Sequence, residues 1–256
     1  MAAAGLTPTA ITSVMAGVPF ETAQPAGSSP VVNQSVFAAL IVAILLFISI
    51  GMYGNFVAQG VVEEKATRII EILLATIPPS GLLAGKVVGI GLVGLLQLAI
   101  TAAAALIAVA ATHVVSIPAL GVGLVATYLV WFVLGFLLYA TAYAGVAALV
   151  SRPEEVQGAT TPISVFLMVS YLLVFVALPN PSSPLVMVCS LLPPFAPILM
   201  SVRIASGDVA LWQVDLALVL MFLSVPAMTW FAGRIYANSV LRTGARRRLV
   251  EAWRGR

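Results

Sequence analysis

The chain has 256 residues, of which 61% are hydrophobic and only 8% are charged. Because about a quarter of the residues in a soluble globular domain are charged, this composition excludes an ordinary water-soluble enzyme or binding domain and indicates a membrane protein. The formal net charge of +3 does not indicate nucleic-acid binding, since the basic residues belong to loops and a tail rather than to one folded face.

Residues 1–35 are rich in small and polar residues and contain a single charged side chain, Glu21. They lack a basic stretch followed by an apolar core, so the pattern is not that of a signal peptide. An uncharged tail ahead of a span with positive residues behind it is readily translocated. We therefore expect a poorly ordered tail outside the cell.

Five apolar stretches are long enough to cross a membrane. A hydrocarbon core about 30 Å thick needs about 20 apolar residues at about 1.5 Å of rise each. The stretches cover residues 36–59, 87–111, 121–150, 162–178 and 211–232. The sequence therefore predicts an all-α polytopic membrane protein with five transmembrane helices.

A short charged segment, residues 61–80, separates the first two spans. Apolar residues recur in it at helical spacing, and Pro78 and Pro79 end the pattern. The charged residues are Glu63, Glu64, Lys65, Arg68 and Glu71. We predict a helix lying at the cytoplasmic surface. It either anchors the loop or docks a soluble partner, and the residues alone leave both interpretations open.

Prolines interrupt the apolar segment 185–205, which precedes the last span. Each half is only about 12–14 Å long as a helix, too short to cross the membrane. The segment is either one kinked span or a hairpin that enters and leaves on the same side. A hairpin puts all basic residues on one side except Arg203, and Lys and Arg near span ends prefer the cytoplasm. The sequence thus predicts a re-entrant hairpin, an external amino terminus and a basic cytoplasmic tail at 239–256.

Few polar residues occur within the spans. Asn55 and Gln59, four residues apart, are expected to hydrogen-bond between helices or to face a pathway. Gly85 and Gly89 have the small-xxx-small spacing that favours close helix packing, within or between subunits. Asp215 is expected to lie at the membrane interface.

No set of residues predicts a catalytic, cofactor-binding or metal-binding site. Cys189 has apolar neighbours and is expected to be an inert packed thiol, and His113 has no second histidine with which to form a metal site. Segment 80–87 lacks the glycine and the Ser or Thr that a phosphate-binding loop needs at its two ends.

Two sequence runs resemble the ABC-2 type permeases, with the sodium-efflux-type branch nearest. The first is IGMYGNFVAQGVVEEK at 50–65, continued by RIIEILL at 68–74 and by Gly85 and Lys86. The second is LPPFAPILM at 192–200 together with Arg203, which is similar to the Pro-Phe-x-Pro segment that precedes the last span in that family. The resemblance covers residues 36–253.

The resemblance implies a permease in the cell membrane that binds a pair of ABC ATPase subunits at its cytoplasmic face and pairs with a second permease subunit, as a homodimer or heterodimer. ATP and magnesium would bind to the ATPase, and this chain would bind no cofactor. Residues 36–238 would form the ABC-2 type transmembrane domain. The implied ATPase-coupling residues are Glu63, Glu64, Lys65, Arg68 and Glu71. The implied re-entrant residues are Pro193, Pro194, Phe195, Pro197 and Arg203.

Two further interpretations stay open. Members of this branch usually begin with an additional span and an external domain, which this sequence lacks. A truncated or split-gene module that assembles with a longer permease, without transporting alone, is therefore the alternative. An ion channel or secondary carrier is less favoured because charge within the spans is scarce. Sodium, drugs, peptides and lipids all stay open as substrates.

Overall fold

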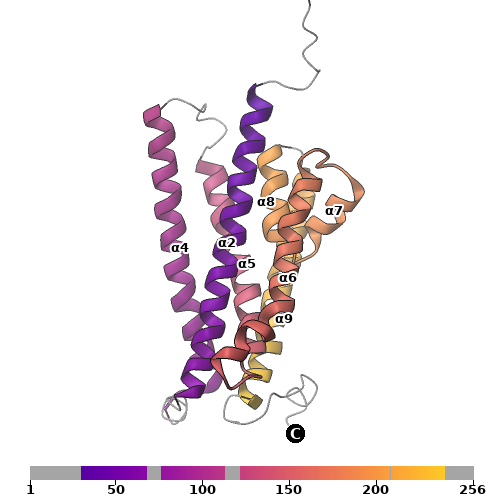
Figure 1. The fold of residues 1–256 in the computed structure, drawn as a ribbon. Helices are drawn as coiled ribbons and strands as arrows, with labels where there is room; N and C mark the ends of the chain where they lie inside the picture. Colours follow the sequence, from indigo (N-terminus) through magenta and orange to yellow (C-terminus); the bar gives the residue numbers. More distant parts are fainter. Residues whose placement is uncertain (1–29, 68–75, 113–121, 208, 240–256) are drawn as a thin grey trace, which may run out of the picture. The chain divides into compact units, whose positions relative to one another are not determined.

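A computed structural model describes residues 30–67, 76–112, 122–207 and 209–239 (Figure 1). The chain divides into two units, residues 1–33 and 34–256. Of the first unit, only the first residues of helix α2 are described. Every regular element within the described ranges is an α-helix, in the order α2 (Pro30–Ala66), α4 (Pro79–Thr112), α5 (Val122–Ala147), α6 (Pro153–Ala177), α7 (Pro184–Leu191), α8 (Ala196–Ser206) and α9 (Leu211–Ser239).

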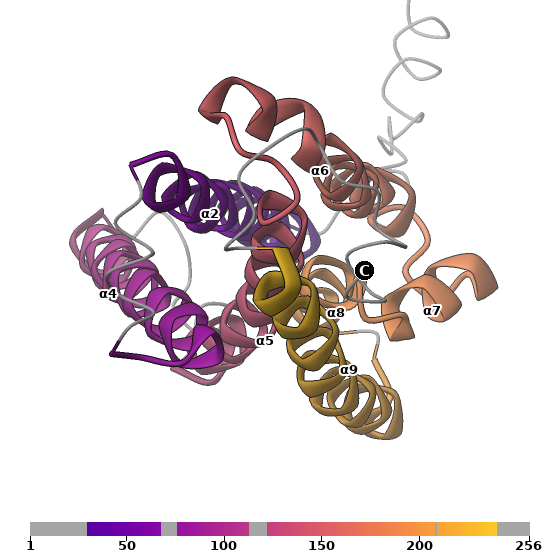
Figure 2. The same cartoon turned by 90° about the horizontal axis from the view of Figure 1, so that it is seen from below.

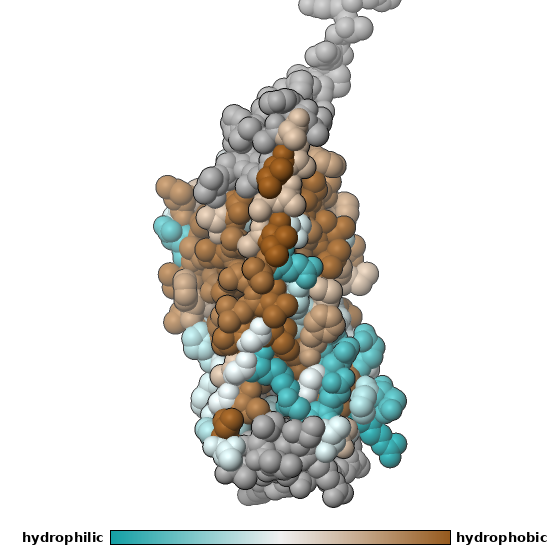
Figure 3. Space-filling model, turned by 90° about the vertical axis from the view of Figure 1, so that its left-hand side faces the viewer, coloured by the Kyte–Doolittle hydropathy of each residue, from teal (hydrophilic) through white to brown (hydrophobic). Residues whose placement is uncertain are grey.

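Five of these helices, α2, α4, α5, α6 and α9, are long and apolar enough to cross a membrane. The face drawn in Figure 3 carries a broad band of hydrophobic side chains, with hydrophilic ones gathered toward the lower end. A belt of this kind matches a bilayer with water beyond it. The predicted all-α polytopic fold with five spans is confirmed.

Helix α5 is the centre of the bundle of residues 34–239. It contacts α4, α6, α8 and α9, and Figure 2 shows it among them. Two thirds of its apolar window (67%) is buried, against 17% for α4 and for α9. Small residues at Ala140, Ala144 and Ala147 have no exposed surface, so neighbouring helices can approach the α5 backbone closely.

The helices alternate in direction, so that their charged ends meet at one end of the bundle (Figure 1). We call this the charged end. It contains the last turns of α2, α5 and α9 and the first turns of α4 and α6. The opposite end contains the last turns of α6 and α8 and the first turn of α9.

Helices α7 and α8 form the hairpin before the last span. Ser183 Oγ caps α7 by accepting a hydrogen bond from the Val186 N–H, with Pro184 in the first turn. Pro193 and Pro194 interrupt the helix, because a proline there cannot donate a backbone hydrogen bond. Helix α8 ends at Gly207, whose φ of 78° is left-handed and favours glycine. The predicted proline-broken hairpin is therefore present.

Some helix bounds differ from those predicted from apolarity. Helix α6 starts at Pro153 rather than near 162, since Pro153 lies in its first turn and Glu154 and Glu155 favour a helix amino terminus. The polar residues that follow do not break it, because the Thr160 and Thr161 hydroxyls donate to carbonyls of their own helix.

The charged segment also differs from its prediction. Residues 61–66 are not the start of a separate surface helix but the last turns of α2, because the sequence between Gln59 and Ala66 contains no proline. Consistent with this, Val61 and Val62 are fully buried. The rest of the predicted helix, at 68–75, lies outside the described residues.

Candidate functional site

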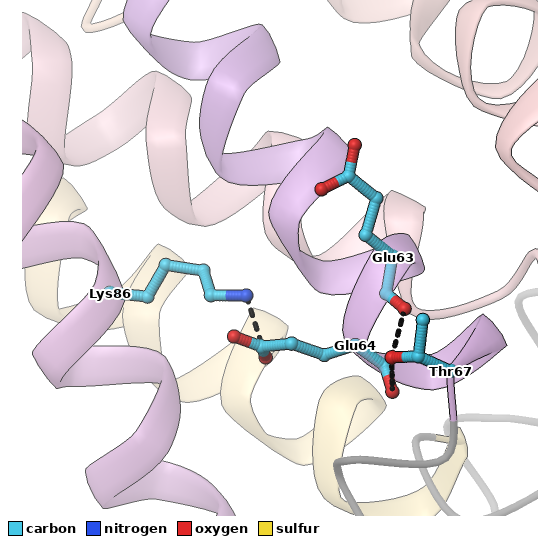
Figure 4. Close-up of polar contacts among 4 residues, drawn as sticks. All are labelled: Glu63, Glu64, Thr67 and Lys86. Atoms are coloured by element: carbon cyan, nitrogen blue, oxygen red, sulfur yellow. Dashed lines mark hydrogen bonds and ion pairs between the residues drawn. The ribbon is translucent and has the colours of Figure 1, made fainter.

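The end of α2 carries three consecutive charged residues that point in different directions, since each helical residue turns about 100° from the last. Glu63 is exposed, Glu64 is partly buried and Lys65 is buried. Figure 4 shows the Glu63 carboxylate pointing away from Lys86, whereas that of Glu64 points toward it. Of the three, Glu63 presents the most surface to the aqueous phase.

Glu64 joins α2 to α4. Its carboxylate lies 2.7 Å from the ammonium group of Lys86, which is 10% exposed, against 27% for Glu64 (Figure 4). Gly60 leaves room for the Lys86 side chain to reach Glu64, because a Cβ atom at position 60 would lie 3.2 Å from Lys86 Nζ. Arg68 and Glu71, the other predicted charged residues of this segment, lie outside the described residues.

Lys65 joins α2 to α5. Its ammonium group donates to the backbone carbonyls of Ala148 and Val150, at 3.0 and 3.3 Å, and the side chain is 3% exposed. These carbonyls follow the last turn of α5, where backbone acceptors have no partner inside the helix and a cation is favourable. Lys65 is therefore placed inward, as an anchor between helices.

The sequence did not identify the polar links that join α2, α4, α5 and α6 at membrane depth. The Tyr53 hydroxyl donates to Gln97 Oε1 between α2 and α4, and Tyr143 and Ser164 share a hydrogen bond of 2.8 Å between α5 and α6. Asn55 donates to the Gly51 carbonyl of its own helix at 2.9 Å. Gln59 is exposed.

The hairpin turn interrupts the helical backbone beside α5 and α6, and two hydroxyl groups donate to its free carbonyl. The Pro194 carbonyl accepts from Tyr139 of α5 at 2.6 Å and from Ser170 of α6 at 3.1 Å. Ser170 lies about 10 Å along the helix from the end of α6. Irregular backbone is tolerated inside a membrane where protein groups replace water in this way.

The turn is also packed against rigid neighbours. Phe195 lies near Phe166 of α6, with ring centroids 6.4 Å apart. Pro197 packs on Gly135 of α5, where a Cβ atom would come within 2.7 Å of the Pro197 ring. Pro193 and Pro194 line a pocket of about 440 Å³ between α5, α6 and α9.

Arg203 lies near the end of α8 and links the hairpin to neighbouring elements by hydrogen bonds. Although its side chain is only 1% exposed, it donates to the Pro181 carbonyl at 3.0 Å, to Ser190 Oγ at 2.7 Å and to Gln213 Oε1 at 2.7 Å. These acceptors belong to the α6–α7 connection, α7 and α9. One guanidinium therefore ties α8 to the elements that precede and follow it.

The two predicted packing glycines differ from their neighbours in α4. At Gly85 and Gly89 an added Cβ atom would meet nothing within 4 Å, so they make no close packing inside this chain. Gly91 and Gly94 do, since a Cβ atom there would lie 2.6 Å from Phe136 and 2.9 Å from Tyr53. Within the described ranges, no group of three or more His, Cys, Asp or Glu side chains is arranged to hold a metal ion.

Together, the five apolar spans, the proline-broken hairpin and the helix ends joined by Glu64 and Lys65 define a polytopic membrane protein. The family model of the ABC-2 family transporter protein matches residues 1–234. The chain belongs to this family and is a multi-pass integral membrane protein.

Two relatives extend this comparison. The chain is 30% identical over 229 residues to the uncharacterized protein YhaP of Bacillus subtilis (strain 168), a match that covers 86% of this chain and 55% of the relative. It is 29% identical over 181 residues to the uncharacterized protein MJ1024 of Methanocaldococcus jannaschii, covering 71% of this chain and 44% of the relative. The chain thus spans about half the length of these curated relatives. No solved structure matches it.

The Glu64–Lys86 ion pair can be tested by exchanging its charges. Glu64→Lys or Lys86→Glu alone is expected to destabilise the protein by about 1–2 kcal/mol, because like charges then meet at a largely desolvated contact. The double exchange should restore most of that loss. Thermal melting of the purified protein measures all three variants. A double variant no more stable than the worse single variant would contradict the pairing.

Proposed function

We propose that the chain is the membrane permease subunit of an ATP-binding-cassette exporter, nearest to the sodium-efflux-type branch, which forms the translocation pathway and couples to a separate ATPase. One observation carries this proposal. Glu64 and Lys65 attach the end of α2 to both α4 and α5, so a force applied to segment 61–80 reaches three helices at once. In this proposal residues 36–238 are the transmembrane domain.

The charged end would face the cytoplasm. Four of the five basic side chains in the described ranges belong to it, namely Lys65, Lys86, Arg152 and Arg234, whereas Arg203 lies at the opposite end. Lys and Arg near span ends favour the cytoplasmic side. The amino terminus would then be outside, and the basic tail 239–256 inside, of the cell membrane.

The proposed cycle uses two anchored elements. The ATPase pair, which holds ATP and magnesium, would dock on segment 61–80, with Glu63 as the most accessible contact and Arg68 and Glu71 as further predicted contacts. Closure of the ATPase would favour the arrangement of α2 and α4 that it binds more tightly, which is a population shift driven by differential affinity. The hairpin, held at Pro194 and Arg203, would form the element beneath the outer mouth.

A second permease subunit would complete the pathway. Support comes from Gly85 and Gly89, which are exposed one turn apart on α4 with open space in front of them. Small residues at this spacing allow another helix to approach closely. The partner would be a second copy of this chain or a similar permease.

Reconstitution with the native ABC ATPase tests the proposal. Vesicles containing both proteins should show ATP-dependent flux when screened against sodium and amphiphilic drugs. Glu63→Lys should uncouple ATP hydrolysis from flux more strongly than Glu154→Lys, since both acids are exposed at the charged end but only Glu63 belongs to segment 61–80. Flux no greater than in vesicles with the ATPase alone would contradict the proposal.

The second candidate is a membrane module that assembles with a longer permease and does not transport alone. It is favoured by the relatives, which are about twice as long as the part that this chain matches. Co-expression with a full-length permease of the family discriminates the two. If the chain is such a module, it should form a stable complex with that permease and show no flux when that permease is absent.

A further inference from the structure

A groove of about 920 Å³ opens between α4, α5 and α9 at the charged end. Its walls include Leu83 and Val87 of α4, Leu137 of α5 and Val225 of α9. The three helices that form the groove are each long and apolar enough to cross a membrane, so its apolar walls belong to membrane-spanning segments.

The threonines in the groove do not make it polar. Thr141 donates to the carbonyls of Leu137 and Leu138, and Thr229 donates to that of Val225, each within its own helix. Their hydroxyl groups are satisfied by the backbone. The wall at this depth therefore suits a hydrocarbon chain.

The groove becomes polar only toward the charged end. Ser80 at the start of α4 and Arg234 and Asn238 in the last turns of α9 line that part. Trp230 lies one helical turn before Arg234 and also lines the groove. A tryptophan followed by an arginine is typical of the level at which lipid headgroups meet the hydrocarbon.

The length of the groove distinguishes a lipid chain from a transmembrane helix. Its lining on α9 runs from Val225 to Asn238, which is about 20 Å at 1.5 Å per residue, and on α4 it runs from Ser80 to Val88, about 12 Å. A spanning helix needs about 30 Å. The groove is thus matched to one leaflet and not to the whole bilayer.

We propose that this groove binds an anionic phospholipid from the leaflet at the charged end, with an acyl chain along α9 and the phosphate at Arg234. The guanidinium has five donors in a planar fork that fits phosphate oxygens, so it can bind a phosphate beside its other contacts. The apolar walls bury the chain. This lipid site goes beyond the proposed transport function and does not depend on it.

Photo-crosslinking tests the site in the intact chain. Phosphatidylglycerol and phosphatidylcholine carrying the same diazirine on an acyl chain are placed, at equal mole fraction, in nanodiscs of unlabelled phosphatidylcholine. Peptide mapping then counts adducts on residues 80–88 and 225–238. Wild-type protein should be labelled there about fivefold more by the anionic probe, the preference that one basic residue gives near a membrane surface.

Two matched pairs of variants separate the site from general effects. Gly233→Leu fills the groove, whereas Gly158→Leu does not, and an added Cβ atom meets nothing within 4 Å at either position. Arg234→Gln and Arg152→Gln each remove one arginine at the charged end, but only Arg234 lines the groove. We expect Gly233→Leu to abolish most groove labelling and Arg234→Gln to remove the anionic preference, with both controls unchanged.

Three results would overturn the proposal. One is equal labelling by the two probes in the wild type, and another is the same loss from Gly158→Leu as from Gly233→Leu. The third is labelling that falls as the protein-to-lipid ratio rises, because a second copy of the chain would then cover the groove. Excess soluble glycerol phosphate should leave labelling unchanged, and competition by it would assign the site to a free phosphate ester instead.

Discussion

Replacing Arg203 with alanine is expected to lower the melting temperature of the purified protein by roughly 6–12 °C. The substitution removes three hydrogen bonds from a buried guanidinium and leaves the Pro181, Ser190 and Gln213 acceptors without that donor. Buried acceptors that lose a charged donor cost about 1 kcal/mol or more each, so the total is about 3 kcal/mol. For a chain of this size, 1 kcal/mol shifts the melting temperature by about 2–4 °C.

Two further variants show whether the geometry of Arg203 matters or only its charge. Arg203→Lys keeps the positive charge but loses the planar fork that reaches three elements, so an intermediate loss is expected. Arg152→Ala removes an exposed arginine and should change the melting temperature little. If Arg203→Ala melted like Arg152→Ala, the buried hydrogen-bond network would not hold the hairpin.

The hairpin could be predicted from the sequence because proline has a local effect that overrides apolarity. Pro193 and Pro194 cannot donate to the preceding turn, so two short helices result whatever surrounds them. Arg203 could be singled out because it is isolated in a long apolar region. The hydrogen-bond partners of the Pro194 carbonyl could not be predicted, since Tyr139 lies 55 positions from it in the sequence and Ser170 lies 24 positions from it. Only packing brings those hydroxyl groups to the turn.

At the charged end, by contrast, the directions of the side chains could not be predicted from the sequence. A count of charges placed Glu63, Glu64 and Lys65 on one surface, but successive helical residues face different ways. The fold turns Lys65 toward the end of α5, 83 positions along the chain, and turns Glu64 toward Lys86. Because α2 continues through this segment, its last turns are part of the bundle. In the proposed function, the residues that would transmit a force and the residue that would meet the ATPase are thus neighbours in sequence.

Gly135→Ala is expected to destabilise the protein by about 2 kcal/mol, and Gly158→Ala to stabilise it by about 0.5–1 kcal/mol. At Gly135 the new methyl would lie 2.7 Å from Pro197 Cβ and 2.9 Å from Ile50 Cδ1. The Ile50 tip can rotate, but the Pro197 ring is rigid in the first turn of α8, so the hairpin must shift, and overpacking of this kind costs about 1–3 kcal/mol. At Gly158 nothing lies within 4 Å, and alanine simply restricts the unfolded chain.

The opposite signs make this pair of variants informative. Both replace a helical glycine with alanine, so their intrinsic effect on helix formation is the same, and the difference between them isolates the contact of α5 with the hairpin. Thermal melting of the two proteins side by side measures it. Equal melting of the two variants would show that Pro197 does not pack against α5.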